Sequence, residues 1–247
     1  MGAVDLSAAA VDAVEIGWVN PDGVEQQMAL DEVGAVPFEL GLPVRQFKSR
    51  KRQRHLSGLW WCATTGGHVG FESWLERDHL IFLDIDTCVV GIASQPFWLQ
   101  WPDESGSRVG HAPDYFARRG DGSSVVVDCR PAERCTARDV AKFEVSAAVC
   151  AQLGWEYRLV GALDPITVAN VRWLAGYRHP RHDLEHVVRL LRERFATPTP
   201  LMVGAAAVGD PIAVLPVLFH LLWRQELSVD LSSPLHPDTS VRCAAPR

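Results

Sequence analysis

The sequence is short of positive charge and almost without lysine. Its 247 residues include 24 lysines and arginines against 30 aspartates and glutamates, a formal net charge of -6, and lysine occurs only at positions 48, 51 and 142. Over the whole chain this balance argues against a nucleic-acid-binding protein, whose surface is expected to be basic. With 47% apolar and 22% charged residues, the composition excludes a disordered tail and suits one large or two small globular domains.

The shortage of positive charge is uneven along the chain. Residues 45–54, RQFKSRKRQR, contain six of the 24 basic residues and no acidic one. We call this stretch the basic segment; its cations are Arg45, Lys48, Arg50, Lys51, Arg52 and Arg54. Such a run is commonly a solvated loop, but its density on an otherwise acidic chain favours contact with DNA phosphates.

The sequence also lacks paired cysteines. Its six cysteines include no CxxC pair, and residues 1–10 have neither the basic start nor the apolar core of a secretory signal. We therefore expect reduced thiols in a cytoplasmic protein. His179, His182 and His186 have spacings that a zinc site uses, but no nearby residue completes the set, which favours a surface helix.

No apolar run is both long and uninterrupted. The run from Leu201 to Trp223 has the length of a bilayer span. At its centre, however, Gly209, Asp210 and Pro211 indicate a helix stop, an N-cap carboxylate and a proline in the first turn of a new helix. We expect two short core helices and no membrane segment.

The sequence predicts a mixture of strands and helices in its first two thirds and mainly helices after residue 164. Residues 13–30 alternate around a turn at 20–23 and predict a β-hairpin. A strand and turn over 58–69 lead into a helix over 71–83. Short strands at 89–92, 97–101, 111–117 and 125–129, a helix at 136–153 and a strand at 155–160 follow. This order predicts an α/β fold. After residue 164 we expect helices at 165–176, 183–195, 200–208 and 211–226, then a terminal β-wing at 227–231 and 239–241.

The stretch 111–131, HAPDYFARRGDGSSVVVDCRP, carries the most information. Its GDG turn at 120–122 predicts a three-residue hairpin loop with glycine available for a left-handed conformation. If the hairpin is symmetric about Asp121, Asp114 faces Asp128, with about 5 Å between their Cβ atoms. Two carboxylates so placed are destabilising unless a cation lies between them. A solvent-facing hairpin with charges on its wet side is the alternative.

Pro113-Asp114, thirteen further residues and then Asp128-Cys129-Arg130 resemble the PD-(D/E)xK nuclease pattern, with arginine in the lysine position. In that chemistry two carboxylates hold Mg²⁺ beside the scissile phosphate, and the cation neutralises developing charge. Alone the pattern matches many unrelated chains. Here FESWLERDHL, VVGIASQPFWLQW, HAPDYF and VDCRP follow in order within roughly residues 58–165. Together they resemble the TnsA-like endonuclease subunit of heteromeric cut-and-paste transposases.

The resemblance implies a restriction-endonuclease-like mixed sheet flanked by helices, and it also implies the site residues. In that family a glutamate in a Ser-x-x-Glu context on the first helix joins the two motif acids at the metals. Ser73-Trp74-Leu75-Glu76 fits this context, so Glu76 is the first choice and Glu72, one turn earlier, the second. Glu76, Asp114 and Asp128 are then the expected ligands of Mg²⁺, with Mn²⁺ as a substitute.

Arg130 is where the sequence departs from the family. Arginine stays protonated at any working pH, so it can stabilise charge but cannot accept a proton from water. Lys142, on the helix after the hairpin, is an auxiliary candidate that would reach back to the site. An ordinary solvated helix residue is the alternative for Lys142.

The function implied is a Mg²⁺-dependent DNA endonuclease subunit that cuts at transposon ends. By the same resemblance its partners are a strand-transferring transposase and an AAA+ ATPase, the latter docking on a C-terminal winged-helix-like region. That region offers few cations for reading DNA, because 211–226 has only Arg224 and His220. A non-catalytic DNA-binding or scaffold subunit and a stand-alone restriction or repair nuclease are the alternatives.

The expected domains follow from these assignments. Residues 1–57 hold the hairpin and the basic segment, 58–180 the nuclease-like core, and 181–247 the winged-helix-like docking region. The last boundary is placed where Arg178-His179-Pro180-Arg181 interrupts the pattern.

Overall fold

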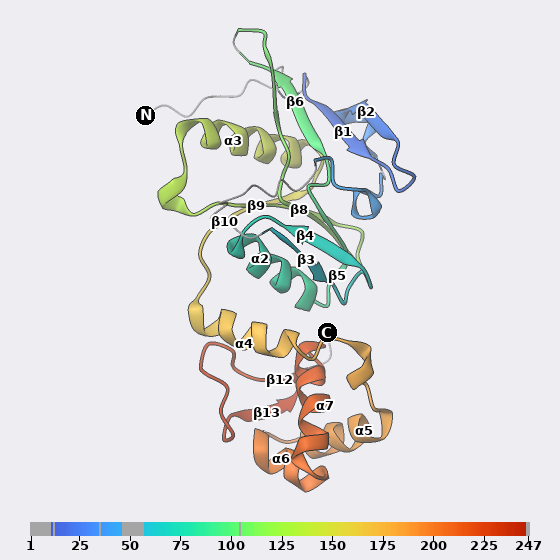
Figure 1. Cartoon of the computed structure of the whole chain (residues 1–247), viewed down its shortest axis with the longest axis vertical. Coiled ribbons are helices and arrows are strands. Elements are labelled where there is room, and N and C mark those ends of the chain that lie inside the picture. Colours follow the sequence, from blue (N-terminus) through green and yellow to red (C-terminus); the bar gives the residue numbers. More distant parts are fainter. Residues whose placement is uncertain (1–10, 12, 35, 46–56, 104, 246–247) are drawn as a thin grey trace. The chain divides into compact units, whose positions relative to one another are not determined.

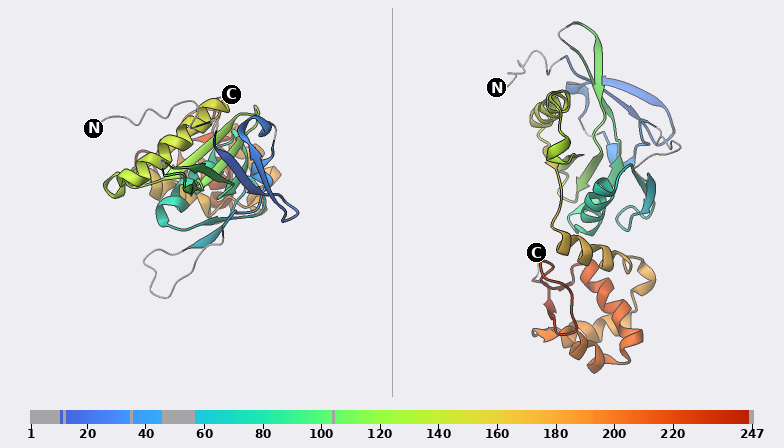
Figure 2. Two further views of the ribbon diagram at one scale, coloured as in Figure 1. Left: turned by 90° about the horizontal axis from the view of Figure 1, so that it is seen from above. Right: turned by 60° about the vertical axis from the view of Figure 1, so that its left-hand side comes forward.

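The chain forms two compact units in the computed structural model, which describes residues 11, 13–34, 36–45, 57–103 and 105–245. The first unit comprises Met1–Asp84 with Cys88–Ala162, and the second Ile85–Thr87 with Leu163–Arg247. Both mix helices with strands (Figures 1 and 2), so the α/β prediction is confirmed.

The first unit is built on two four-stranded sheets. In the first sheet the order is β2-β1-β6-β7 and every pair is antiparallel. Its strands are β1 (Glu15–Val19), β2 (Glu25–Ala29), β6 (Trp98–Pro102) and β7 (Arg108–His111). β1 and β2 form the hairpin predicted around residues 20–23.

The second sheet has the order β10-β9-β8-β5, with β10 parallel to β9 and the other pairs antiparallel. Its strands are β5 (Val89–Ser94), β8 (Tyr115–Arg119), β9 (Ser124–Cys129) and β10 (Glu156–Val160). The helix α3 (Ala137–Gln152) makes the crossover from β9 to β10. Such a connection is required because parallel neighbours cannot be joined by a tight turn.

The two faces of the second sheet are buried under different elements, because side chains alternate along each strand. Phe116 and Val126 pack into a cluster with Val145 and Val149 of α3. The opposite face packs with Leu80 and Leu83 of α2 (Trp74–Ile85) and with the hairpin of β3 (Gly58–Trp61) and β4 (His68–Phe71). Figure 1 shows α2 and α3 on opposite sides of this sheet.

The helix predicted over 71–83 begins three residues later, at Trp74. Phe71 instead ends β4, where it pairs with Gly58. Ser73 and Glu76 fix the helix start, because the Ser73 hydroxyl accepts from the Glu76 amide at 3.2 Å and donates to the Glu76 carboxylate at 2.8 Å. The hydrogen bond from the Glu76 amide to the Ser73 hydroxyl is an N-cap interaction, which marks a helix N-terminus.

The second unit is mainly helical. Its helices are α4 (Pro165–Ala175), α5 (Glu185–Arg194), α6 (Leu201–Val208) and α7 (Pro211–Trp223). A small antiparallel sheet of order β11-β13-β12 joins Thr199–Pro200, Ser240–Cys243 and Leu227–Ser228. The predicted break in the apolar run is confirmed, because the Asp210 side chain caps α7 and Pro211 opens it. No helix in the described ranges has the length and apolar character needed to cross a bilayer.

The division between the units falls after residue 162 instead of near residue 180. α4 belongs with the later helices, since Trp173 and Tyr177 pack on Phe219 of α7. His220 adds a 2.7 Å hydrogen bond between its Nδ1 and the Tyr177 carbonyl oxygen. The N-terminal hairpin is likewise part of the first unit's sheet and not a separate domain.

Candidate functional site

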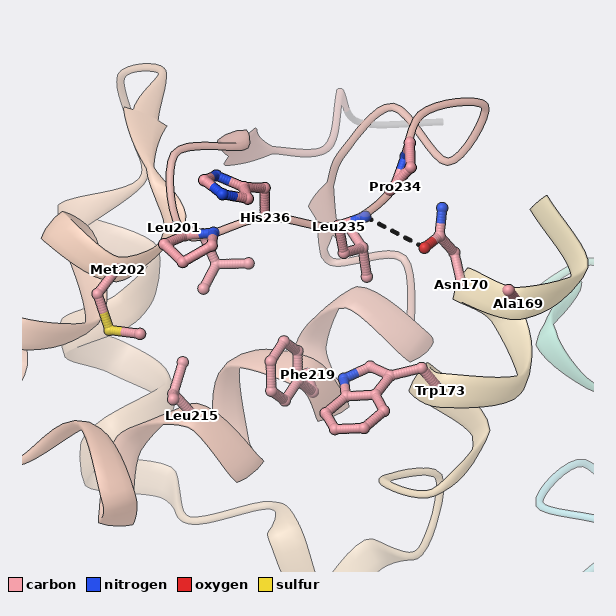
Figure 3. Close-up of a pocket in the computed structure, with 11 residues that line it drawn as sticks. Ala169, Asn170, Trp173, Leu201, Met202, Leu215, Phe219, Pro234, Leu235 and His236 are labelled. Atoms are coloured by element: carbon pink, nitrogen blue, oxygen red, sulfur yellow. Dashed lines mark hydrogen bonds between the residues drawn. The ribbon is translucent and has the colours of Figure 1, made fainter. Parts of the chain in front are cut away.

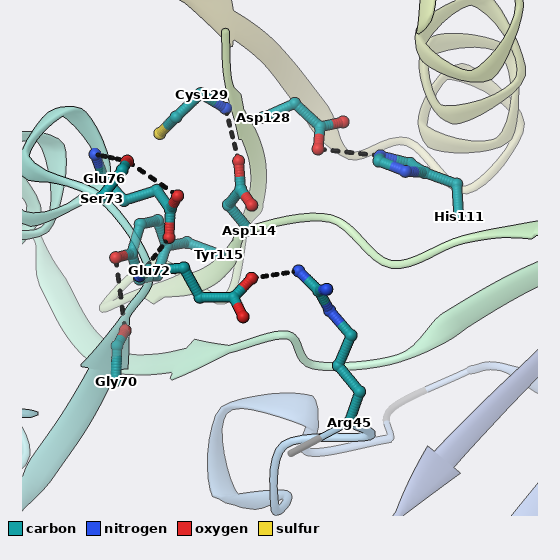
Figure 4. A network of polar contacts seen from close by, with 10 residues as sticks. All are labelled: Arg45, Gly70, Glu72, Ser73, Glu76, His111, Asp114, Tyr115, Asp128 and Cys129. Atoms are coloured by element: carbon teal, nitrogen blue, oxygen red, sulfur yellow. Dashed lines mark hydrogen bonds and ion pairs between the residues drawn. The ribbon is translucent and has the colours of Figure 1, made fainter. Parts of the chain in front are cut away.

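The ionisable residues singled out by the sequence gather in one cavity of the first unit. This cavity, of about 380 Å³, is called the acidic pocket below. Its ionisable lining residues are Arg45, Glu72, Glu76, His111, Asp114, Asp128, Cys129, Arg130, Asp139 and Lys142. They come from segments far apart in sequence, and Figure 4 shows four of the acids, with the Asp128 carboxylate turned to His111 and the Glu72 carboxylate to Arg45.

The hairpin of β8 and β9 has the predicted register. Tyr115 pairs with Val127 and Ala117 with Val125, so the strands are symmetric about Asp121. Gly122 supplies the left-handed conformation of the loop, with φ of 87°. Asp114 lies one residue before β8, where its carboxylate accepts a 2.7 Å hydrogen bond from the Cys129 amide.

Asp114 is an electrostatically unfavourable carboxylate. Burial raises its pKa well above the usual value, and the charges of Glu76 and Asp128 raise it further. The hydrogen bond from the Cys129 amide and, less strongly, the charge of the Arg45 guanidinium lower this pKa. Glu76 and Asp128 therefore lie close enough to Asp114 for their charges to act on its ionisation.

Glu76 is held at the start of α2. Its carboxylate accepts from the Glu72 amide at 2.7 Å and from the Ser73 hydroxyl at 2.8 Å. Burial raises its pKa in spite of these hydrogen bonds, with Glu72 raising it further and Arg45 lowering it. The same Ser-x-x-Glu spacing that caps the helix thus places a buried carboxylate at the pocket.

Asp128 is almost fully buried and both its oxygens are engaged. Oδ1 lies 2.8 Å from His111 Nε2, and Oδ2 accepts a 2.8 Å hydrogen bond from the Tyr157 hydroxyl. Burial and the nearby Asp128 charge raise the pKa of Tyr157. Asp128 is therefore fixed by two neighbours, one from β7 and one from β10.

Arg130 turns toward the N-terminus of α3. Its Nη2 lies 2.8 Å from Asp139 Oδ2, the carboxylate that also caps this helix through Thr136. Hydrogen bonds from Thr136, and less strongly from Arg130, lower the pKa of Asp139 to about 2. Lys142 lines the same pocket, as does Phe143. The structure thus brings Lys142 to the site wall.

Arg45 is the described member of the basic segment that reaches the acids. Its Nη2 lies 2.5 Å from Glu72 Oε2, and Figure 4 shows the guanidinium directed into the group of carboxylates. The other five predicted DNA contacts, Lys48, Arg50, Lys51, Arg52 and Arg54, lie outside the described residues.

The donor atoms of the pocket suit Mg²⁺. Magnesium is usually bound by one or two carboxylates, with water and substrate phosphates completing its coordination. Glu76 and Asp114 meet this need, because both are buried and a divalent cation would offset their mutual repulsion. Within the described ranges, no group of three His, Cys, Asp or Glu side chains is already arranged to hold a metal ion. The set of three ligands that includes Asp128 stays a prediction.

Two residues of the pocket region were missed by the sequence argument. His111 had a usable signal, because it stands three residues before Asp114 in the HAPD motif. Tyr157 had none, since it reaches Asp128 only through the parallel pairing of β10 with β9. In the part of the chain that the structure describes, none of the six cysteines forms a disulfide, and burial is the main cause that raises the pKa of buried Cys62 to about 12.

The second unit contains a cavity of different character. About 420 Å³ in volume, it is lined mainly by apolar side chains, among them Trp173, Met202, Leu215 and Phe219 (Figure 3). Asn170 stands at its wall, where its side-chain oxygen accepts from the Leu235 amide. The described residues that line this cavity include no carboxylate, in contrast to the acidic pocket.

The comparison with protein families agrees with the geometry. Residues 86–161 match the family described as TnsA-like endonuclease N terminal. No curated protein matches the chain. The matched residues run from before β5 to the end of β10 and include Asp114, Asp128 and Arg130, with Glu76 just upstream. The mixed α/β arrangement of the first unit is consistent with an endonuclease-like fold. This match supports a TnsA-like endonuclease domain at residues 86–161, inside the stretch of roughly 58–165 for which the ordered motifs predicted it, and it contains three of those four motifs.

Proposed function

We propose that the chain is the Mg²⁺-dependent DNA endonuclease subunit of a heteromeric transposase and hydrolyses phosphodiester bonds at transposon ends. The observation that carries this proposal is the acidic pocket, where burial raises the pKa of both Glu76 and Asp114 and the charges of Glu76 and Asp128 raise that of Asp114 further. Buried carboxylates held together in this way are typical of a site built for a cation. The family match covers two of these three acids.

In the proposed site, Glu76 and Asp114 hold Mg²⁺, and Asp128 is the third ligand of the set. The bound cation would polarise the scissile phosphate and lower the pKa of the attacking water. The chain's own residues keep the acids in place: Ser73 orients Glu76, the Cys129 amide orients Asp114, and His111 with Tyr157 orients Asp128. Because these hydrogen bonds already hold the carboxylates in place, the site needs little reorganisation when the reaction occurs.

Arg130 supplies positive charge near the phosphate in this proposal. It cannot take a proton from water, because a guanidinium stays protonated. Its pairing with Asp139 holds the guanidinium at the pocket wall. Lys142 adds a second cation on that wall and is the auxiliary candidate for proton transfer.

The proposed partners are DNA, a strand-transferring transposase and an AAA+ ATPase. The basic segment would contact transposon-end phosphates close to the pocket, because Arg45 at its start already lines it. In this proposal the helices and small sheet of the second unit form a winged-helix-like region that docks the ATPase. His220 on α7 is buried and bonded to Tyr177, which speaks against α7 as a DNA-reading helix.

Removal of the Asp114 carboxylate tests the proposed function. Asp114→Ala should abolish Mg²⁺-dependent cleavage of transposon-end DNA in the presence of the partner transposase. Asp121→Ala is the matched control. It removes a carboxylate from the same hairpin, but in the exposed loop at the opposite end of the strands from Asp114. Undiminished cleavage by Asp114→Ala would overturn the assignment.

A non-catalytic scaffold or DNA-binding subunit is the second candidate. The ion pair between Arg130 and Asp139 favours this second candidate. The charge of the motif arginine is already neutralised there by the carboxylate that helps to cap α3. A Mn²⁺ binding isotherm that disappears in Asp114→Ala supports the nuclease, whereas no isotherm in the wild-type protein supports the scaffold. Cleavage without any partner would instead indicate a stand-alone nuclease.

A further inference from the structure

Arg45 brings a fixed positive charge into the acidic pocket from outside the nuclease motifs. Its Nη2 lies 2.5 Å from Glu72 Oε2, and the Glu72 side chain is only about one-fifth exposed. The Glu72 amide in turn donates to the Glu76 carboxylate. The guanidinium is therefore joined to Glu76 through a single intervening residue.

The backbone beside Arg45 is anchored to the site. The Val44 amide donates to the Gln95 carbonyl oxygen at 3.0 Å, and the Gln95 amide donates to the Asp114 carbonyl oxygen at 2.9 Å. Gln95 is buried and adopts a left-handed conformation with φ of 48°. A non-glycine residue in that conformation persists only where its surroundings hold it there. Arg45 is thus positioned by the same backbone connections as Asp114.

The charge of Arg45 acts on both acids that would hold a metal ion. Arg45, Glu76 and Asp114 line the same cavity, and Glu72 connects the guanidinium to the Glu76 carboxylate. Arg130, by contrast, is directed to Asp139. Of these two arginines, Arg45 is therefore the one whose charge is directed at the carboxylates that would hold a metal ion.

We propose that Arg45 is a further determinant of cation binding at this site: its guanidinium is the resident counter-ion of Glu72, Glu76 and Asp114, and a divalent cation binds in competition with it. This inference rests on the proposed function, because it concerns the same carboxylates. It assigns Arg45 a role beyond that of a phosphate contact. Two cations drawn to one group of acids repel each other, so the arginine charge must weaken metal binding.

Mn²⁺ binding to the full chain, measured by isothermal titration calorimetry without DNA, tests this inference. Arg45→Gln removes the competing charge and should bind Mn²⁺ roughly tenfold more tightly than the wild-type protein. Arg45→Lys keeps the charge and should stay close to wild type. Arg119→Gln is the matched control for net charge, because Arg119 pairs with Glu156 at the far end of β8; its Mn²⁺ affinity should not change.

The outcomes separate this inference from the proposed function. Equal Mn²⁺ affinity in wild-type protein and Arg45→Gln overturns the role of Arg45 while leaving the metal site standing. An equal gain in Arg45→Lys and Arg45→Gln also overturns it, because charge would then not be the cause. If neither the wild-type protein nor Arg45→Gln binds Mn²⁺, the inference and the metal site fail together. If Arg45→Gln binds Mn²⁺ and the wild-type protein does not, the result supports a competition strong enough to prevent Mn²⁺ binding in the wild type.

Discussion

The guanidinium of Arg130 pairs with the Asp139 carboxylate, with 2.8 Å between Nη2 and Oδ2. Asp139 also accepts from the Thr136 amide and hydroxyl, so one carboxylate caps α3 and holds the arginine. Arg130 Nε is buried and has no acceptor among the residues that the structure describes. An arginine at the motif position therefore keeps one donor unused at the wall of the acidic pocket.

We expect the positive charge of Arg130, more than its guanidinium shape, to be needed for cleavage. Arg130→Ala should lower the rate by roughly 100-fold, the usual effect of removing one stabilising donor from a reaction centre. Arg130→Lys should retain most of the rate, because lysine keeps the charge. Single-turnover cleavage assays would measure this, with exposed Arg134→Ala as control. A rate in Arg130→Ala equal to wild type would contradict it.

The raised pKa of Asp114 predicts how stability depends on pH. In the folded protein Asp114 binds its proton more tightly than in the unfolded chain, so stability falls as pH rises from the ordinary carboxyl pKa through the higher folded value. Asp114→Asn should remove that decline and be more stable than wild type at neutral pH without metal. Asparagine can still accept from the Cys129 amide.

Thermal unfolding in EDTA between pH 4 and pH 8 would measure the effect of Asp114→Asn. The gap between the two proteins should widen as pH increases and shrink when Mn²⁺ is added, because only the wild-type carboxylate benefits from the cation. A constant gap at all pH values would show that Asp114 does not carry the destabilising charge.

Tyr157 and Asp128 should be energetically coupled, so that their contributions to the free energy of unfolding are not additive. A hydrogen bond to a charged group contributes about 1.5 to 3 kcal/mol, and this one lies between a buried carboxylate and a partly buried hydroxyl. Urea unfolding of Tyr157→Phe, Asp128→Asn and the double variant forms a double-mutant cycle. Additive decreases in the free energy of unfolding would rule the coupling out.

The basic segment should set the salt dependence of DNA binding. Replacing Lys48, Arg50, Lys51, Arg52 and Arg54 with glutamine should flatten the plot of log affinity against log salt, by up to about 0.9 for each phosphate that the segment no longer neutralises. Fluorescence anisotropy with labelled transposon-end duplex at several salt concentrations gives the slope. Unchanged slopes would place the phosphate-binding residues elsewhere in the chain.

Features decided by neighbouring residues were predictable from the sequence. The register of β8 and β9 follows from the GDG turn at 120–122, because a short hairpin loop fixes which residues face each other. The break at Asp210 and Pro211 follows from helix-capping chemistry within one turn. Two of the acids at the pocket were found in this way, and the ordered motifs added Glu76.

Other boundaries depended on packing between distant segments. The unit division at residue 162 differs from the expected 180, because α4 packs on α7 through Trp173 and Phe219. The local pattern at 178–181 marks an interruption between helices, but it does not say which helices pack together.

The sequence by itself determined the strand register, the helix caps and the identity of the motif acids, since each depends on residues close along the chain. Only the tertiary structure decided that Arg45 enters the acidic pocket and that His111 and Tyr157 hold Asp128. Those contacts join different strands and loops, and their geometry follows from how two sheets and α3 pack around a shared core. The electrostatics of the site is therefore a property of the fold, because burial and long-range neighbours set it.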